Sequence, residues 1–414
     1  MSKPKIRFKG YEEDWEQRKL GDLVDVLDGD RGKNYPTSDD FDISGHTIFL
    51  NASNVTNNGF LFQDNQFITE EKSNNMGNGK LEEDDIVITS RGSLGHIAWY
   101  NADISSLMPY ARINSGMLIL RNKKEIETEY LYHFMKSDKG QSQISFISFG
   151  SAQPQLTKKG VEDLKVILPT RRDEQTQLGH CFSSLDHLIT LHQRKCEETK
   201  KLKKYMLQKM FPQNGKRVPE IRFAGFTDDW EQRKLPEFVT FFNGLTYTPD
   251  DVEETGTLVL RSSNVKNGEI VDADNVYVND KVVTSENVQE GDIIVVVRNG
   301  SRALIGKHAQ IKAPMPNTVI GAFMSGIRSE HSSFVNALLD TSAFENEIAK
   351  NMGATINQIT GYMFSKMEFM IPSGEEQQKI GEYFQSFDDL ITLHQRKYEE
   401  LQKIKKFMLQ NMFI

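Results

Sequence analysis

The chain contains the same long amphipathic segment twice, and this duplication limits what it can fold into. Residues 174–211 and 376–413 align without a gap, and 24 of the 38 positions are identical. Apolar residues recur at heptad spacing in both copies, which is typical of coiled-coil helices. At about 1.5 Å per residue, each helix would be roughly 55 Å long. One small domain cannot bury a stripe of that length, so we expect the two helices to pack on each other as an antiparallel coiled coil.

The predicted seam between the helices passes through His192 and His394, which would lie near an approximate two-fold axis. A histidine or lysine in such a seam more often fixes helix register than performs chemistry. The predicted seam and register residues are Leu185, Leu188, His192, Lys195, Phe387, Leu390, His394 and Lys397. The lysine runs at 200–204 and 403–406 are expected to be solvated, although a partner or DNA phosphates could use them.

A second repeat marks the start of each half of the chain. Residues 6–20 reappear with the same key residues at 221–235, and a proline precedes each long helix, at Pro169 and Pro372. These landmarks predict a pseudo-two-fold α+β protein with two divergent globular modules. The expected boundaries are 1–172 and 213–374 for the modules, and 173–212 and 375–414 for the central and C-terminal helices.

Both modules show short β-rich runs broken by turn residues and followed by a helix. In the first module the runs cover residues 46–50, 60–62, 85–89, 96–100 and 117–120, with a helix at 128–139. In the second they cover residues 257–260, 293–297, 304–305 and 318–323, with a helix at 333–350.

Polar loops at matching positions of the two modules are the candidate working surfaces. Arg, Asn, Gln, Ser and Thr are the side chains that contact base edges and phosphates in DNA. Surface loops with ordinary turn chemistry have a similar composition, but Arg91 and Arg298 correspond across the duplication and each follows a β-run. The candidate DNA-binding residues are Ser53, Asn54, Ser90, Arg91, Ser93, Gln153, Gln155, Arg261, Ser263, Asn264, Arg298, Asn299, Arg302, Asn357 and Gln358.

Composition restricts the class of protein only weakly. The formal net charge of −8 argues mildly against nucleic-acid binding, but phosphate contacts need only a local basic face. No apolar stretch is long enough to span a membrane and the first residues lack a signal sequence, so we expect a cytoplasmic protein. Cys181 and Cys196 fit neither a disulfide framework nor a zinc site.

No catalytic signature is found in the sequence. The segment from Gly300 to Lys307 resembles a phosphate-binding loop, but His308 stands where a magnesium-binding hydroxyl residue belongs. Zinc-protease, nucleophile-elbow and dinucleotide-binding motifs are missing as well. We therefore predict no catalytic, cofactor-binding or metal-binding residues in this chain.

The order of these features resembles that of the specificity subunits of type I restriction-modification systems, over the whole chain. The residues that carry the resemblance are Trp15, Lys19, Leu20, Gly150, Gln155, Pro169, Glu174 and Gln175, with Trp230, Lys234, Leu235, Gly353, Gln358, Pro372, Glu376 and Gln377 in the second half. No single motif among them is specific to this family. The order of the motifs, the duplication and the long helices are specific when taken together.

The resemblance implies a protein that recognises double-stranded DNA without cutting or methylating it. Each module would be a target-recognition domain for one half of a split DNA sequence, and the helices would set the spacing between the halves. The helices would also dock two modification subunits, which bind the methyl donor and methylate adenine at N6. Two restriction subunits would add ATP- and magnesium-dependent translocation and cleavage, and no membrane would be involved.

Two other functions are compatible with parts of the sequence. A duplicated coiled-coil scaffold that binds other proteins would suit the negative charge but leaves the divergence of the modules unexplained. A stand-alone enzyme is opposed by the missing motifs. Salt-dependent DNA binding would distinguish a DNA reader from a scaffold.

Overall fold

The computed structural model describes residues 3–148, 155–213, 215–352 and 357–413. Contacts between residues divide the chain into two units. Unit 1 consists of residues 1–191 and 397–414, and unit 2 consists of residues 192–396. Each unit therefore contains one globular module together with a part of both long helices. The four-part division at the helix boundaries remains a prediction.

Unit 1 is built around a four-stranded sheet of order β2-β10-β7-β8. Its strands are β2 (Val24–Asp28), β10 (Met117–Asn122), β7 (Asp85–Thr89) and β8 (Ile97–Tyr100). Beside it lie a three-stranded sheet, with β6 (Phe67–Ile68), β3 (Thr47–Leu50) and β9 (Ala111–Ile113), and a hairpin of β4 (Val55–Thr56) and β5 (Gly59–Phe60). The short helices are α1 (Leu20–Leu23), α2 (Glu70–Asn75), α3 (Ala102–Leu107), α4 (Thr128–Lys136), α5 (Asp138–Ser148) and α6 (Lys158–Glu162).

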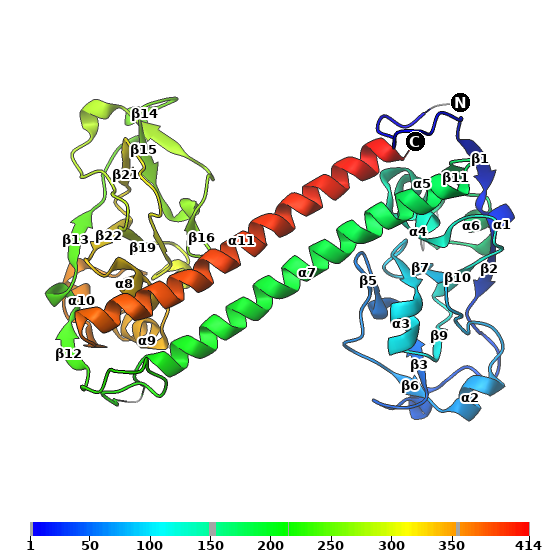
Figure 1. Cartoon of the computed structure of the whole chain (residues 1–414), viewed down its shortest axis with the longest axis horizontal. Coiled ribbons are helices and arrows are strands. Elements are labelled where there is room, and N and C mark those ends of the chain that lie inside the picture. The colour runs from blue at the N-terminus through cyan, green and yellow to red at the C-terminus, as the bar shows by residue number, and fades with distance from the viewer. Residues whose placement is uncertain (1–2, 149–154, 214, 353–356, 414) are drawn as a thin grey trace. The chain divides into compact units, whose positions relative to one another are not determined.

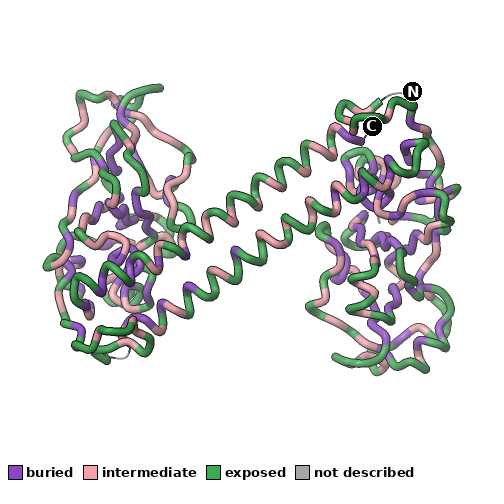
Figure 2. The backbone as a smooth tube through the Cα atoms, viewed as in Figure 1, coloured by how far each residue is buried: buried purple, intermediate pink, exposed green. Residues whose placement is uncertain are grey.

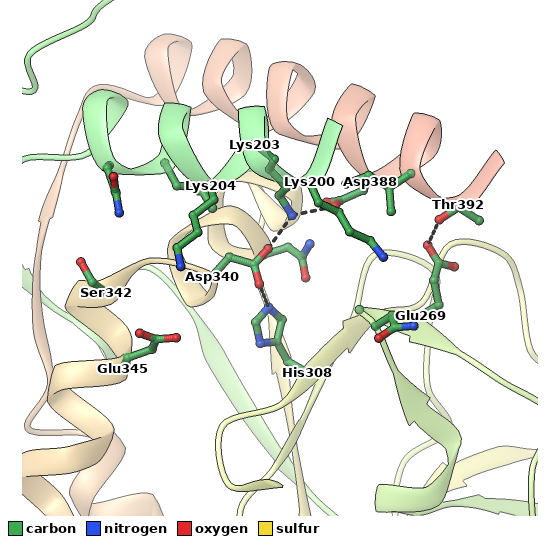
Figure 3. A pocket seen from close by; sticks show the side chains of 16 residues that line it. Lys200, Lys203, Lys204, Glu269, His308, Asp340, Ser342, Glu345, Asp388 and Thr392 are labelled. Carbon is green, nitrogen blue, oxygen red and sulfur yellow. Dashed lines mark hydrogen bonds and ion pairs between the residues drawn. The ribbon is translucent and has the colours of Figure 1, made fainter. Parts of the chain in front are cut away.

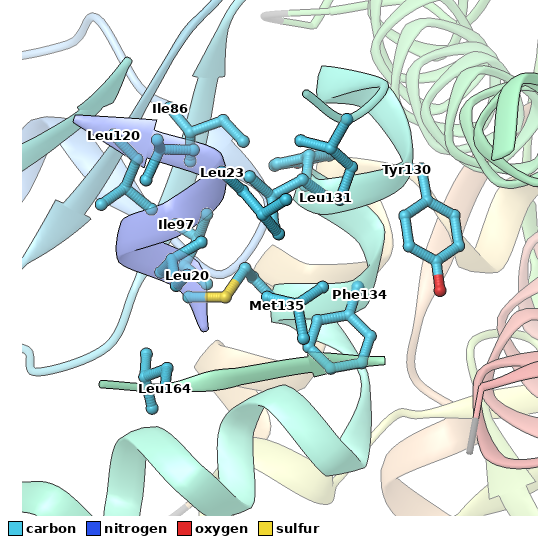
Figure 4. Close-up of a cluster of buried hydrophobic side chains, with 14 of the residues drawn as sticks. Leu20, Leu23, Ile86, Ile97, Leu120, Tyr130, Leu131, Phe134, Met135 and Leu164 are labelled. Atoms are coloured by element: carbon cyan, nitrogen blue, oxygen red, sulfur yellow. The ribbon is translucent and has the colours of Figure 1, made fainter. Parts of the chain in front are cut away.

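Strand β7 is buried at all five positions, and its three central residues are apolar because both faces of the strand pack into cores. Ile86 and Ile88 belong to the core that α1 and α4 cover, whereas Val87 belongs to a second core beneath β3 and β9. Figure 4 shows side chains of α1 and α4, such as Leu23 and Leu131, packed against this first face. The loop that follows β7 is therefore carried by a strand that packs into two cores.

Unit 2 repeats this plan with different side chains. Its main sheet contains β13 (Thr240–Asn243), β22 (Met324–Arg328), β19 (Ile293–Val296) and β20 (His308–Gln310), in that order. A second sheet contains β14 (Val252–Glu253), β18 (Val276–Val278), β15 (Thr257–Leu260) and β21 (Thr318–Ile320), and β16 (Val265–Lys266) pairs with β17 (Glu269–Ile270). The short helices are α8 (Ser332–Leu339), α9 (Ser342–Asn351) and α10 (Gly361–Phe364) (Figure 1).

The two long helices are α7 (Arg172–Met210) and α11 (Gly374–Met412), within two residues of the predicted bounds. The predicted helices at 128–139 and 333–350 are each two helices, since α4 ends before α5 and α8 before α9. One predicted strand is wrong: residues 304–305 follow the 3-10 turn Arg302–Leu304, and the strand begins only at His308. The apolar pair Leu304 and Ile305 packs into cores from this turn.

The repeated segment at the start of each half ties the module to a long helix. A two-stranded sheet joins β1 (Glu16–Lys19) to β11 (Lys165–Leu168) in unit 1, and β12 (Glu231–Lys234) to β23 (Glu368–Ile371) in unit 2. The guanidinium of Arg7 binds both carboxylate oxygens of Glu174, at 2.7 and 2.9 Å. Arg222 binds Glu376 in the same way, at 2.7 and 2.8 Å. The Glu-Gln motif at the start of each helix is therefore structural.

Each of these segments also contacts the end of a long helix. In unit 1 the Ile6 amide donates to the Asn411 carbonyl of α11, at 3.0 Å. In unit 2 the Ile221 amide donates to the Lys209 carbonyl of α7, at 2.9 Å. Phe413 also packs on Phe182, with ring centroids 5.2 Å apart, so the last residues of the chain complete the core of unit 1.

The buried stripe of each long helix differs from the predicted seam by one column. Figure 2 shows buried or half-buried positions separated by exposed ones along both helices. One predicted column contains Leu185 and His192 in α7, and Phe387 and His394 in α11. These residues are buried or half-buried, as predicted. Leu188 and Leu390 are 40% and 46% exposed, and Lys195 and Lys397 are exposed too, so assigning these four to the seam was wrong. The second column is Phe182, Ile189, Cys196, Lys203 and Met210 in α7, and Phe384, Ile391, Tyr398, Lys405 and Met412 in α11.

Lys203 and Lys405 belong to this second column, and cross-helix carboxylates compensate their burial. In unit 2, Lys203 Nζ lies 2.6 Å from Asp388 and 2.5 Å from Asp340 (Figure 3). Burial alone would lower the pKa of Lys203, but the two carboxylates outweigh it and the pKa is raised. In unit 1, Lys405 pairs with Asp186. The expectation that these two lysines are solvated is therefore wrong.

Contacts within unit 2 also show how its two helix segments run. His192 Nδ1 lies 3.0 Å from His394 Nδ1, and Lys203 pairs with Asp388. As residue numbers rise along α7 they fall along α11, so the segments are antiparallel.

Among the described residues, no helix has the length and apolar character that crossing a membrane requires.

Candidate nucleic-acid interface

The loop after β7 brings two predicted residues of module 1 together. The amides of Ser90 and Arg91 both donate to the Gly116 carbonyl, at 2.8 and 3.2 Å, and the Leu156 amide donates to the Ser90 carbonyl, at 3.0 Å. These bonds hold the segment around Gln155 beside the loop. Arg91 Nε then donates to Gln155 Oε1, at 3.0 Å, on the exposed surface.

Module 2 has the same backbone arrangement with different side chains. The amides of Val297 and Arg298 donate to the Phe323 carbonyl, at 3.0 and 3.2 Å, and the Ile359 amide donates to the Val297 carbonyl, at 2.8 Å. Arg298 and Gln358 face each other in an isolated β-bridge. The guanidinium of Arg298 lies over the Phe323 ring, 5.1 Å from its centroid.

Asn299 joins three of the predicted loops of module 2 into one surface. Its Nδ2 donates to Ser262 Oγ at 3.0 Å, and its backbone amide donates to the Asn357 carbonyl at 3.4 Å. Asn357 Nδ2 in turn donates to the Gly300 carbonyl, at 3.0 Å. The loops at 261–264, 298–302 and 357–358 are therefore neighbours in space, although up to 97 residues separate them in the chain.

In module 1 the loop at 51–54 lies beside the loop at 90–96. A Cβ atom added at Gly92 would be 4.0 Å from the Cβ of Ala52. His96 Nδ1 lies 3.0 Å from the Val55 carbonyl, which fixes the two loops further. Both modules thus present a composite surface from loops after equivalent strands.

Both loops are carried by strands that an ion pair to a buried aspartate fixes at the opposite end. In module 1, Arg121 on β10 binds Asp85 at the start of β7, at 2.8 Å. In module 2, Arg328 on β22 binds Asp292 next to the start of β19, at 2.7 Å. The hydrogen bonds to Asp292 raise the pKa of Arg328, and this guanidinium stays charged. The position of each loop is thus set by its strand.

Three of the predicted contacts are corrected because their side chains are buried. Asn54 and Asn264 are 1% and 0% exposed, and their amide groups bind backbone atoms. Asn54 accepts from the Asn51 amide and donates to the Leu61 carbonyl, both at 3.0 Å, and Asn264 makes the equivalent bonds in module 2. Ser90 is buried too. These residues shape the loops and cannot reach a base.

The other predicted residues differ in exposure and in whether their polar groups are already bound. Ser53 is exposed, but its hydroxyl donates to Asn51 Oδ1 at 2.6 Å. Arg261 is half-buried and bound to the Asp274 carboxylate at 2.5 Å, which neutralises it. Ser93, Ser263 and Arg302 are exposed. Gln153 lies outside the described residues.

Phe323 was not among the predicted residues, and the structure adds it to this surface. Its side chain is 55% exposed although it follows the buried strand β21. Gly116 occupies the equivalent place in module 1. The available signal in the sequence was an aromatic residue at a position where the other copy has glycine.

Comparisons with known proteins agree with this duplicated arrangement. Residues 12–201 and 227–403 match the family described as the type I restriction modification DNA specificity domain. The type I restriction enzyme MjaVIII specificity subunit of Methanocaldococcus jannaschii is 25% identical, with 95% of this chain and 91% of the relative aligned. The EcoKI specificity subunit of Escherichia coli K12 is 25% identical over 43% of this chain and 40% of its own length.

A solved structure shares the fold. The S subunit of a type I restriction-modification system from M. genitalium superposes with a TM-score of 0.71 and 14% sequence identity. The superposition covers 100% of this chain and 99% of that one.

Within the described part of the chain, no group of three His, Cys, Asp or Glu residues is placed to hold a metal ion.

Proposed function

The chain belongs to the family of type I restriction-modification specificity proteins, and from this we propose that it is the DNA-recognition subunit of such a complex. Each module would read one half of a split target sequence. The observation that carries the proposal is the pair of composite surfaces around Arg91 and Arg298. Their backbone frame is the same while their side chains differ, as two readers of different half-sites require.

The side chains on these surfaces suit contacts to base edges. An arginine can donate two hydrogen bonds to guanine, and asparagine or glutamine can bind adenine in the same bidentate way. Arg91 with Gln155, and Arg298 with Asn299 and Gln358, supply these groups on loops that rigid strands position. We therefore assign direct base reading to Arg91 and Arg298.

The long helices would then fix the distance between the two half-sites. The contacts of unit 2 run antiparallel through His192 and His394, and the heptad columns continue into unit 1, where Asp186 pairs with Lys405. These features support an antiparallel coiled coil. Removing one heptad from both helices should then change the length of the unread gap in the target and leave each half-site recognisable.

The exposed apolar residues of the helices support docking of two copies of one partner. They occur at equivalent positions of the duplication, so each long helix presents a similar outer patch. The patches are Leu202 and Tyr205 on α7 in unit 2, and Ile404 and Phe407 on α11 in unit 1. Two similar patches suit two modification subunits. We place the methyl donor and N6-adenine methylation on those subunits, and ATP and magnesium on two restriction subunits.

These patches can be tested one at a time. Replacing Leu202 and Tyr205 by aspartate should remove one modification subunit, and the same change at Ile404 and Phe407 should remove the other. Native mass spectrometry of the co-expressed complex gives the number of subunits. Full assembly of both variants would exclude the patches as docking sites.

The proposed function itself is tested by mapping N6-methyladenine in the source genome with and without this gene. We expect a split motif with a fixed unread gap to lose methylation on deletion. Conversely, an unchanged pattern, together with no sequence preference of the co-expressed complex in DNA binding, would favour a scaffold. The matched family does not support that alternative.

A further inference from the structure

A groove in unit 2 lies between the long helices and the module. One part is a pocket of about 500 Å³, with walls from α7, α8, α9, α11 and the turn before β17. A second pocket of about 480 Å³ adjoins it and is lined by the loop that precedes β20. Both pockets share Asn267, Gly268, His308, Asp340 and Glu345, so they form one continuous groove. Figure 3 shows Lys200 and Lys204 extending into it from α7.

Three of the four carboxylates that line the groove are bound to a lysine. Asp340 and Asp388 share the single charge of Lys203, which leaves one negative charge, and Glu269 binds Lys312 at 2.7 Å. Within the described residues, four lining cations have no ion-pair partner, whereas Glu345 is the one lining carboxylate without a partner. The four cations are Lys200, Lys204, Arg302 and Lys307, and all are exposed. The unpaired charge of the groove is therefore positive, although the whole chain is acidic.

The groove is continuous with the surface that we assign to base reading. Arg302 and Lys307 belong to the same loop as Arg298 and Asn299, which begins where β19 ends. The line of unpaired cations thus runs from this loop to α7. A ligand that follows it would be bound at the reading surface and beside the helix at the same time.

Module 1 has larger side chains at the positions that correspond to this part of module 2. Ile86 faces Trp99 across the sheet, whereas the corresponding Ile293 faces Gln310. Tyr132, which packs on Trp99, is replaced by Asn336 on α8. The loop between the two strands is also shorter, since it covers residues 90–96 in place of 297–307. This loop contains no lysine, and Arg91 is its one basic residue besides His96.

We propose that this groove binds the sugar-phosphate backbone of one DNA strand next to the half-site that module 2 reads. Lysines act as point charges toward phosphates, and such contacts add affinity without sequence information. The contacts would be made by unit 2 alone. The inference rests on the proposed function, since it needs DNA at the reading surface.

The test uses the complete complex with its modification subunits and measures DNA binding over a range of salt concentrations. Two double variants remove charge: Lys200→Gln with Lys204→Gln, and Arg302→Gln with Lys307→Gln. The duplexes are the target found by methylation mapping and a scrambled sequence. We expect each double variant to bind both duplexes several-fold more weakly, with a salt slope smaller by about two. The preference for the target should stay unchanged.

Two further variants sharpen the result. Lys403→Gln with Lys406→Gln removes exposed lysines of α11, where Lys406 is the counterpart of Lys204, and should leave the salt slope unchanged. Glu345→Gln removes the opposing carboxylate and should strengthen binding to both duplexes.

Three results would overturn the proposal: an unchanged salt slope in both groove variants, an equal loss in the α11 control, or a loss of modification subunits from the complex. The last would identify an acidic protein surface as the occupant. If the wild-type complex does not distinguish the target from the scrambled duplex, the proposed function fails, and the two failures remain distinguishable.

Discussion

The two reading loops share a backbone frame and differ in how they hold an arginine. In module 1 Arg91 donates a hydrogen bond to Gln155, and Gly116 stands where module 2 has Phe323. In module 2 the guanidinium of Arg298 lies on the exposed ring of Phe323. Side chains on this surface can therefore differ while the backbone hydrogen bonds that form it stay the same. A new specificity therefore requires no new fold.

The modules also differ where they meet the long helices. Lys203 is bound by Asp388 of the other helix and by Asp340 of module 2, whereas Lys405 is bound by Asp186 of the other helix. The residue of module 1 that corresponds to Asp340 is Lys136, which lies over the Tyr132 ring. The two lysines are therefore equivalent in the duplication, but Lys203 has two carboxylate partners and Lys405 has one.

The largest expected effect follows from removing one of these lysines. Lys203→Met leaves the half-buried Asp388 and Asp340 without their shared partner, and we expect unit 2 to lose about 3 kcal/mol of unfolding free energy. Lys405→Met should cost unit 1 less, because a single carboxylate, one-third exposed, is left. Urea unfolding followed by hydrogen exchange in each unit measures both. Equal losses in the two units would contradict the inequality of their surroundings.

The next effect concerns the reading arginines. Arg91→Ala and Arg298→Ala should each weaken recognition of one half-site only, by about 1–3 kcal/mol, if each side chain reads a base. Competition binding with targets mutated in one half at a time separates the two. Equal loss for every sequence would identify these residues as phosphate contacts instead.

The third prediction compares the acid sensitivity of the units. His133 of unit 1 is buried, with Ser183 Oγ 3.0 Å from its Nε2, and Ala337 takes its place in unit 2. Burial first, then the charges of Lys405 and Lys136, hold the pKa of His133 well below its usual value. The unfolded chain therefore binds a proton that the folded unit does not, and stability falls as pH drops below about 6.5.

The expected loss in unit 1 is on the order of 1 kcal/mol between pH 6.5 and 5.5. Hydrogen exchange at both pH values, read separately for residues of each unit, provides the measurement. His133→Gln should reduce the pH dependence of unit 1. A larger acid effect in unit 2 would show that His394, whose pKa burial and His192 also lower, dominates instead.

The smallest effects concern the residues that hold the arginines. Phe323→Ala removes a cation–π contact of about 0.5–1 kcal/mol and should weaken only the half-site that Arg298 reads. Gln155→Ala should do the same for Arg91, with a loss of about 0.5–1.5 kcal/mol. Combining either change with its own arginine variant in a double-mutant cycle tests the coupling. Additive losses would show that neither residue positions its arginine.

Much of the frame could be predicted because it depends on local sequence. The helix bounds, the strand at residues 85–89 and the correspondence of Arg91 with Arg298 follow from periodicity and duplication. The second seam column could not, since the apolar Leu188 and Leu390 are exposed while Lys203 and Lys405 lie inside. The carboxylates that compensate these lysines are far away in the sequence, so no local pattern reveals the pairing.

The site was predicted at the level of loops but not of single side chains. Asn54 and Asn264 have the residue type that reads bases, yet they hold their own loops together. Phe323 was missed because an apolar residue after a buried strand normally belongs to the core. Whether a loop side chain points outward depends on backbone bonds from distant segments, such as those to residues 155–156 and 357–359.

The last residues of the chain complete the core of unit 1, where Phe413 packs on Phe182 and the Asn411 carbonyl binds Ile6. During translation, unit 2 leaves the ribosome as one continuous stretch, whereas unit 1 must wait until residues 397–414 have been made. At ordinary rates of synthesis this delay is on the order of 10–40 s. The core of unit 1 can therefore close only after the whole of unit 2 has been made, although most of unit 1 is synthesised before it.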